Sequence, residues 1–274
     1  MNYGVVLPIW QLTAREAESL TVRAEALGLD GVFVPDHILA KPATTQHYGG
    51  HWPDPFALLA YLAGRTQRIR LGASVIVLPY RNALVAAKAA ATVDQVSGGR
   101  FIFGVGVGWD EAEFVDLRLP FRERGRLSDD YIRAIKAAWA SDVPEYDGPY
   151  VSFSGATFAP RPVQQPHPPI WIGASGEKRM MPIAARYADV WHCFGGPDEL
   201  APKSGRLDRM AEAAGRDPAG IRRAASLSLD DSDDKVARRV DEWRAAGFDT
   251  LICGWPGAGR PRIEKFAQRF LARA

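Results

Sequence analysis

The stretch GASVIVLPYRNALVAAKAAATVDQVSGGRFIFGVGVGW, residues 72–109, contains two apolar strands joined by an Ala-rich helix. Its second strand carries Gly104, Gly106 and Gly108, which alternate with valines and therefore lie on one face of the strand. A face without side chains leaves room for a flat ligand or for a neighbouring backbone. The spacing differs from the G-x-G-x-x-G fingerprint, so these glycines do not indicate a dinucleotide phosphate loop.

The same strand–helix unit repeats along the chain. Apolar runs predict strands at residues 3–8, 31–34, 69–78, 101–107, 170–172, 189–194, 223–229 and 250–254, each followed by a helix. Such units form parallel strands with helical crossovers, either in a closed barrel or in an open, doubly wound sheet. Eight units in about 250 residues favour a single-domain (β/α)8 TIM barrel over residues 1–274. Loops at about 36–55 and 143–169 are long enough to be insertions.

Composition limits the class of partner. The formal net charge is +2 and no basic stripe with interleaved aromatic residues occurs, so nucleic acid is not an expected partner. No apolar run approaches the roughly 18 residues that a membrane helix needs. Met1 leads directly into a strand without a basic leader, and Cys193 and Cys253 are too far apart in sequence to suggest a disulfide framework. We expect a cytoplasmic protein that acts on a small molecule.

Catalytic groups in such a barrel lie where the strands end. The pair Asp36–His37 follows the second strand, and an imidazole can exchange protons near neutral pH beside a carboxylate that binds a ring N–H or a polar edge. A helix-capping aspartate beside a loop histidine fits the pattern equally well. His192 ends the sixth strand and is either a pocket residue or a core histidine. The other histidines are expected to be exposed or structural: His47, His51 and His167.

A possible anion site follows the fifth strand. Gly173, Ala174, Ser175 and Gly176 precede a helix expected to begin near residue 177. Free N–H groups at a helix start, with a serine hydroxyl, favour a phosphate. No metal-binding motif and no G-x-S-x-G nucleophile elbow occurs, so neither a metal site nor a serine hydrolase is predicted.

Taken together, these motifs resemble one known family. The segments LPYRNALVAAKAAATVDQVSGGRFIFGVGVGW, AEALGLDGVFVPDH, PRPVQQPHPPIWIGASG and AARYADVW are similar to those of the luciferase-like flavin and deazaflavin oxidoreductases, the bacterial luciferase superfamily. The resemblance implies a (β/α)8 barrel, a homodimer, and a flavin or deazaflavin ring lying over the strand ends. It also implies a non-proline cis peptide at Ser74–Val75, a ring-contacting Asp36, a catalytic His37 and a cofactor phosphate at residues 173–176.

The chain departs from the pattern at one position. Sugar-phosphate dehydrogenases of this family carry a glutamate after the fourth-strand glycines, where this chain has Trp109. Oxidation of a sugar phosphate is therefore not expected, and His37 is the main candidate for proton transfer. Asp110, Glu111 and Glu113 follow closely, but acidic residues here are expected to begin the next helix.

The resulting hypothesis is an oxidoreductase that transfers a hydride between the deazaflavin coenzyme F420 and a small organic substrate. His37 would exchange the proton and Asp36 would position the ring. The expected cofactor-binding residues are Asp36, Ser74, Val75, Gly106, Gly108, Gly173, Ala174, Ser175, Gly176 and His192. One alternative is a monooxygenase of the same superfamily that uses reduced FMN and dioxygen. Another is a non-catalytic cofactor-binding protein.

Overall fold

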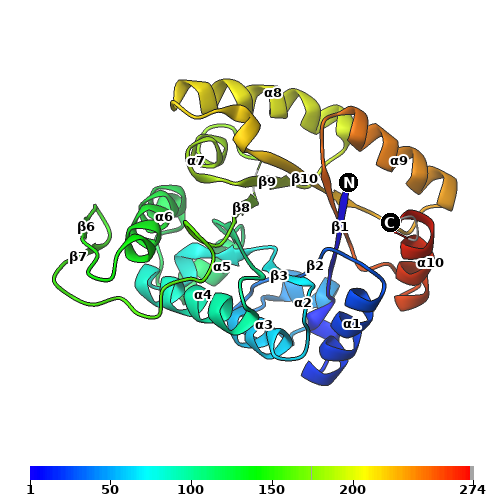
Figure 1. Ribbon diagram of the computed structural model, residues 1–274, viewed down its shortest axis with the longest axis horizontal. Helices are drawn as coiled ribbons and strands as arrows, with labels where there is room; N and C mark the ends of the chain where they lie inside the picture. The colour runs from blue at the N-terminus through cyan, green and yellow to red at the C-terminus, as the bar shows by residue number, and fades with distance from the viewer. Residues whose placement is uncertain (174, 272–274) are drawn as a thin grey trace.

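A computed structural model describes residues 1–173 and 175–271, and its parallel strands close into one barrel (Figure 1). The sheet order is β3-β2-β1-β11-β10-β9-β8-β5-β4, and a further pairing of β3 with β5 closes the ring. The strands are β1 (Asn2–Val6), β2 (Gly31–Val34), β3 (Arg70–Ala73), β4 (Ile76–Val77), β5 (Phe101–Gly106), β8 (Ile170–Gly173), β9 (Val190–Cys193), β10 (Arg222–Leu227) and β11 (Thr250–Cys253). This architecture confirms the predicted single-domain barrel.

Helices surround the strands on all sides (Figure 1). The longer ones are α1 (Ala14–Ala26), α3 (Pro55–Ala63), α4 (Ala83–Ser97), α6 (Arg124–Ala140), α7 (Met180–Tyr187), α8 (Pro197–Ala213), α9 (Asp233–Ala245) and α10 (Arg260–Phe270). Two short helices, α2 (Pro42–Tyr48) and α5 (Glu111–Asp116), lie in connections that follow strands. The small antiparallel hairpin β6 (Tyr146–Asp147) and β7 (Ser152–Phe153) lies outside the ring of helices, beside α6 (Figure 1). No helix in the described part of the chain is long and apolar enough to cross a membrane.

Local sequence signals set the ends of several helices. Thr13 and Glu16 form a reciprocal capping box at the start of α1. The Asp54 carboxylate caps α3 by accepting a hydrogen bond from the Ala57 amide. Gly98 ends α4 in the left-handed conformation, at φ 64°, which glycine adopts without a steric penalty.

The apolar core has two layers. The larger lies between strands and helices. The buried face of α4 in this layer consists mostly of alanines, whose small side chains allow close packing. The smaller fills the barrel interior and consists of Phe33, Ile102, Trp171, Val190, Ala224 and Ile252. Bulky side chains thus close the lower part of the barrel, and the functional groups are restricted to its upper end.

The structure corrects two predicted boundaries. The strand expected at residues 69–78 is divided into β3 and β4, with Ser74 and Val75 between them. The Ser74–Val75 peptide bond is cis, as the family resemblance implied. The helix expected from residue 177 begins only at Met180, because the chain first makes a turn in which the Gly176 carbonyl accepts from the amides of Met180 and Met181.

The glycines of β5 make room for this interrupted strand. A Cβ on Gly104 would lie 1.8 Å from the carbonyl oxygen of Ala73, and one on Gly106 would lie 2.5 Å from Val75 Cγ2. Gly173 on β8 faces Val75 from the other side, where a Cβ would lie 2.5 Å from Cγ1. Of the two sequence interpretations, the space therefore serves a neighbouring segment of the chain, with Val75 filling the gap that glycines leave on two strands.

We expect Gly104→Ala to destabilise the fold severely. The new methyl group would overlap a backbone oxygen that no side-chain rotation can move, so the cost should be about 3 kcal/mol. Urea unfolding followed by tryptophan fluorescence would measure it.

Gly205→Ala is the matched control. Gly205 lies inside α8 with no atom near its missing Cβ, so alanine there should raise the free energy of unfolding by about 0.5–1 kcal/mol. Equal effects of the two substitutions would contradict the packing role assigned to Gly104.

Candidate active site

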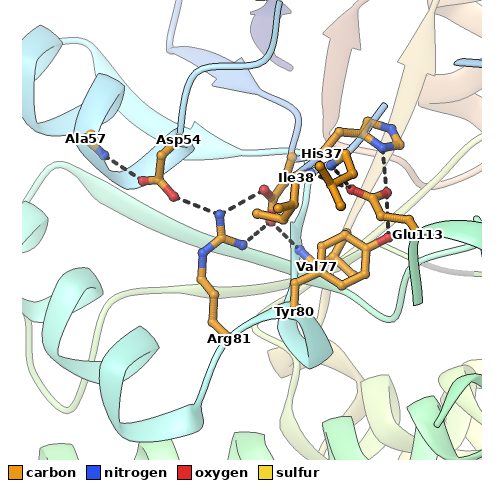
Figure 2. Close-up of polar contacts among 10 residues, drawn as sticks. His37, Ile38, Asp54, Ala57, Val77, Tyr80, Arg81 and Glu113 are labelled. Atoms are coloured by element: carbon orange, nitrogen blue, oxygen red, sulfur yellow. Dashed lines mark hydrogen bonds and ion pairs between the residues drawn. The ribbon is translucent and has the colours of Figure 1, made fainter. Parts of the chain in front are cut away.

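The first element of the site is the buried carboxylate of Glu113. Asp110 caps α5 by accepting from the Ala112 amide, and this places Glu113, in the first turn, over the end of β5. Glu113 is fully buried, and its Oε2 lies 2.9 Å from His37 Nδ1 and 2.8 Å from the Tyr80 hydroxyl (Figure 2). Oε1 accepts from the backbone amides of Ile38 and Leu39 at 2.5 and 2.9 Å.

These hydrogen bonds determine the protonation of the cluster. Burial alone would raise the pKa of Glu113, but hydrogen bonds from His37, Leu39, Tyr80 and Ile38 outweigh it and lower that pKa below its usual value. Burial, with the bond to Glu113, raises the pKa of Tyr80, so its hydroxyl remains a donor. Because an ionised carboxylate only accepts, His37 must donate through Nδ1–H, and its Nε2 is left for another partner.

Aromatic side chains surround the His37 ring. The ring centroid of Trp52 lies 4.7 Å away and that of Trp109 lies 6.0 Å away, both in edge-on arrangements. Trp109 is 63% exposed, and Ile38 and Leu39, which follow His37 in the chain, are also exposed. The histidine therefore lies beside an apolar, solvent-facing surface.

Asp36 is held by a different group of residues. Its carboxylate is buried and accepts from the Val77 amide at 2.9 Å and from both terminal nitrogens of Arg81. Arg81 also binds the Asp54 carboxylate at 2.8 Å, which links the end of β2 to β4 and to the start of α3 (Figure 2). The contacts of Asp36 in the structure are thus with the protein, and its role toward a cofactor stays a prediction.

The barrel interior beneath the site contains Val75 and His192. Val75 packs against Gly106 and Gly173, as described above, at the level where β5 and β8 end. His192 is buried, with Nε2 3.5 Å from the Ser226 hydroxyl, and burial lowers its pKa to about 4. The imidazole is consequently neutral at pH 7.

A pocket of about 590 Å³ opens beside the strand ends, between the start of α6 and the turn before α7. It begins at Val107, directly after β5, and Gly176 lines its other side. Its charged lining residues are Arg122, Glu123, Arg124, Arg126, Glu177, Lys178 and Arg179. Gly176 of the predicted anion-binding turn therefore faces an open, mainly basic cavity.

The remaining predicted residues are placed as follows. Gly108 adopts φ 77° in the turn after β5, where a Cβ would meet Phe114 and Val77 at 2.8 Å. His47 and His51 are exposed, while the His167 ring packs 6.1 Å from Trp139. Ala174 lies outside the described residues. Within those residues, no group of three or more His, Cys, Asp or Glu side chains is arranged to hold a metal ion.

Glu113 is the partner of His37 that sequence reasoning missed. Its acidic neighbours behave as expected, since Asp110 caps the helix and Glu111 is exposed in the first turn. The position of Glu113 in the sequence could have indicated its place, because a helix that starts shortly after a barrel strand puts its first turn over the barrel mouth.

The fold places the chain among the TIM-type α/β barrels, with its candidate groups at the carboxyl ends of the strands. The chain belongs to the family described as luciferase-like monooxygenase, whose model matches residues 1–269. Its relatives include an F420-dependent dehydrogenase and a pyrimidine monooxygenase.

Several relatives share this family. An uncharacterized protein of Mycobacterium tuberculosis is 30% identical over 100% of this chain and 98% of its own length. The F420-dependent glucose-6-phosphate dehydrogenase of Amycolatopsis mediterranei is 34% identical over 85% of this chain and 71% of its own. The pyrimidine monooxygenase RutA of Yersinia enterocolitica is 31% identical over 75% of this chain and 57% of its own length. An F420-dependent secondary alcohol dehydrogenase, solved with an F420-acetone adduct, shares the fold with a TM-score of 0.83 at 18% identity, covering 100% and 99% of the two chains.

We expect Glu113→Gln to destabilise the protein at pH 7 by about 1–3 kcal/mol, because the amide cannot accept from all four donors. The folded-state pKa of Glu113 is lowered, so its charged form stabilises the fold above the ordinary carboxyl pKa, and this stabilisation is lost as pH falls through the folded value. The difference in free energy of unfolding between parent and variant should therefore become smaller below about pH 4.

Urea unfolding at several pH values tests this expectation. Glu111→Gln, on the exposed face of the same helix, is the control and should match the parent throughout. If the loss of unfolding free energy in Glu113→Gln were the same at every pH, the charge of Glu113 would not contribute to stability.

Proposed function

We propose that this protein is an oxidoreductase that transfers a hydride between coenzyme F420 and a small organic substrate. The observation that carries the proposal is the His37–Glu113 pair at the strand ends, in a chain 34% identical to an F420-dependent dehydrogenase. An imidazole whose other nitrogen is fixed by a carboxylate is suited to move one proton at a defined position.

The residues around the strand ends fit such a cofactor. Val75, flanked by Gly106 and Gly173, offers a low apolar surface on which a flat ring could lie. Gly176 lines the basic pocket, which suits a phosphate. The neutral His192 beneath the site adds a polar group without a charge.

When bound, the deazaflavin would supply or accept the hydride at its C5 position. For a substrate with a C=O, C=N or activated C=C bond, hydride addition to the carbon would move the π electron pair to the other atom, and the protonated His37 ring would give that atom its Nε2 proton and be left neutral, with Nδ1–H still on Glu113. A nitroaromatic is a further candidate acceptor. In the reverse direction Nε2 of the neutral ring would accept the hydroxyl proton of an alcohol as its carbon gives up hydride. Glu113 acts as a positioning residue, since its negative charge stays bonded to the ring that gains the proton.

The surface beside His37 favours an apolar substrate. Trp52 and Trp109 flank the imidazole, and Ile38 and Leu39 are partly exposed next to it. Trp109 stands where the sugar-phosphate dehydrogenases have a glutamate. These features support a planar or aliphatic substrate over a sugar phosphate.

A second candidate is a monooxygenase that uses reduced FMN and dioxygen, which the 31% identity to a pyrimidine monooxygenase favours. Titration of the protein with F420 and with FMN, followed by tryptophan fluorescence, separates the two. Tight binding of F420 alone supports the dehydrogenase or reductase, whereas tight binding of FMN alone would reverse the assignment. Binding of neither would indicate a non-catalytic protein.

The resemblance to the family also supports a homodimer, which sedimentation equilibrium would test. We extend the proposal to a cytoplasmic location, supported by the low cysteine content of the chain, whose two cysteines, Cys193 and Cys253, are both buried.

We expect His37→Gln to lower kcat by about 10²–10⁴-fold while changing the Kd for the cofactor little, because the side chain moves a proton and does not hold the ring. His51→Gln, in the exposed loop before α3, is the control and should keep parental turnover. Steady-state kinetics with a panel of carbonyl and alcohol substrates provides the measurement. Parental kcat in His37→Gln would rule out the assigned proton transfer.

A further inference from the structure

The Tyr80 hydroxyl and the His37 ring bind the same oxygen atom. Tyr80 ends the 3-10 helix Leu78–Tyr80, which follows β4, and it donates to Glu113 Oε2 at 2.8 Å, while His37 Nδ1 lies 2.9 Å from that atom (Figure 2). The other oxygen, Oε1, accepts from two backbone amides of the loop after β2. Two side chains from different parts of the chain therefore share the charge of one carboxylate oxygen.

The Tyr80 ring is held by packing that does not need its hydroxyl. The ring lies edge-on to Phe114, with 5.1 Å between the ring centroids, and Phe114 is fully buried. Phe114 adjoins Glu113 in α5, so the aromatic contact and the hydrogen bond both hold Tyr80 to the same short helix. A phenylalanine in place of Tyr80 would keep the ring contact and lose the bond to the carboxylate.

A carboxylate oxygen that serves two donors binds each of them less strongly than it would bind one alone. The negative charge of Glu113 favours the protonated, positively charged form of the His37 ring over the neutral form. A second donor on Oε2 takes up part of that charge, so it weakens the attraction between the carboxylate and the protonated ring. The Tyr80 hydroxyl consequently shifts the protonation equilibrium of the ring toward its neutral form.

We propose that Tyr80 is a positioning residue for proton transfer, which acts through Glu113 to set the pH range in which His37 exchanges its proton. The inference deepens the proposed function and rests on it for the reaction that uses this proton. Because four donors hold Glu113 in its charged form, the Nδ1 proton stays on the ring and exchange takes place at Nε2. Glu113 fixes which nitrogen exchanges the proton, and Tyr80 adjusts the pH at which it does so.

The other titratable or charged groups around the ring are engaged elsewhere or exposed. They come from the loop after β2, the segment before α3, the residue after the 3-10 helix, and α5 with its cap: Asp36, Lys41, His51, Asp54, Arg81, Asp110, Glu111 and Asp116.

None of these groups shares an oxygen with His37. Asp36 and Asp54 both bind Arg81. Lys41 pairs with Asp116, and Asp110 caps α5. His51 and Glu111 are exposed to solvent, which screens their charges. Removal of the Tyr80 hydroxyl leaves all of these contacts in place, so a change in His37 reports on the shared Glu113 oxygen.

The test replaces Tyr80 by phenylalanine and uses Tyr146→Phe as the matched control. Tyr146, on β6, donates at 2.5 Å to Asp130 of α6, a fully buried carboxylate whose other oxygen accepts from the amides of Tyr150 and Val151. The partners that the structure describes for Asp130 include no histidine. Both variants lose a phenol donor to a buried carboxylate, so both should lose some stability, but only Tyr80→Phe should alter His37.

The first measurement is an NMR titration of the histidine ring nitrogens in the protein without any cofactor, with the His37 signals identified by their loss in His37→Gln. We expect the midpoint of the His37 titration to rise by about 0.5–1 pH unit in Tyr80→Phe, a change of roughly threefold to tenfold in the protonation equilibrium. Nδ1 should stay protonated throughout, and Tyr146→Phe should keep the parental midpoint. A fluorinated tyrosine at position 80, a stronger donor of nearly the same size, should lower the midpoint.

The second measurement is the pH profile of kcat with F420 and a carbonyl or alcohol substrate. Reduction of a carbonyl requires the protonated His37 ring and oxidation of an alcohol requires the neutral ring. In Tyr80→Phe both profiles should therefore move to higher pH by the amount seen in the NMR titration, while the Kd for F420 stays parental.

Each outcome decides one part of the inference. An unchanged or lowered midpoint in Tyr80→Phe, or an equal rise in Tyr146→Phe, would overturn it whatever the cofactor. A raised midpoint with a parental pH profile of kcat would overturn the role of Tyr80 in proton transfer and leave the proposed hydride transfer standing. A raised midpoint in a protein whose parent turns over no substrate with F420 would overturn the proposed function and keep the link from Tyr80 to His37. If Tyr80→Phe does not fold, the fluorinated tyrosine decides, and an unchanged midpoint there would count against the inference.

Discussion

Four hydrogen bonds to the buried carboxylate of Glu113 organise the mouth of this barrel. The donors come from the loop after β2 and from the 3-10 helix Leu78–Tyr80, while the acceptor comes from α5. A carboxylate in this setting avoids the penalty of burial only because its lone pairs are filled by donors. The same bonds fix the tautomer of His37, so one ion both ties three connections together and aims the Nε2 atom.

The bridge from Asp36 through Arg81 to Asp54 supports this arrangement from the opposite side. It fixes the end of β2, β4 and the first turn of α3 relative to one another. Asp36 and His37 are adjacent in sequence yet belong to separate polar networks, one facing inward to Arg81 and one facing Glu113. The mouth is therefore held by paired charges, while the barrel below is held by apolar packing.

Much of this could be predicted from the sequence because the signals are local. Alternating apolar runs and helix caps predicted the strands and the barrel, and the spacing of Gly104 and Gly106 predicted a face without side chains. What filled that face could not be predicted, since Ala73 at the end of β3 and Val75 in the break before β4 come from about thirty residues earlier, and such proximity is set by tertiary packing. Glu113 was missed for the same reason. Its sequence context is an ordinary helix start, and the bond to His37 spans 76 residues.

The packing of Val75 also limits which substitutions this barrel can accept. One side chain occupies space left by Gly106 on β5 and Gly173 on β8, so the three positions share a single volume. A larger residue at either glycine becomes acceptable only when position 75 shrinks, which makes substitutions at these sites strongly non-additive. Substitutions at the barrel mouth must then exchange side-chain volume among these three positions, so the surface presented to a ligand changes in discrete steps.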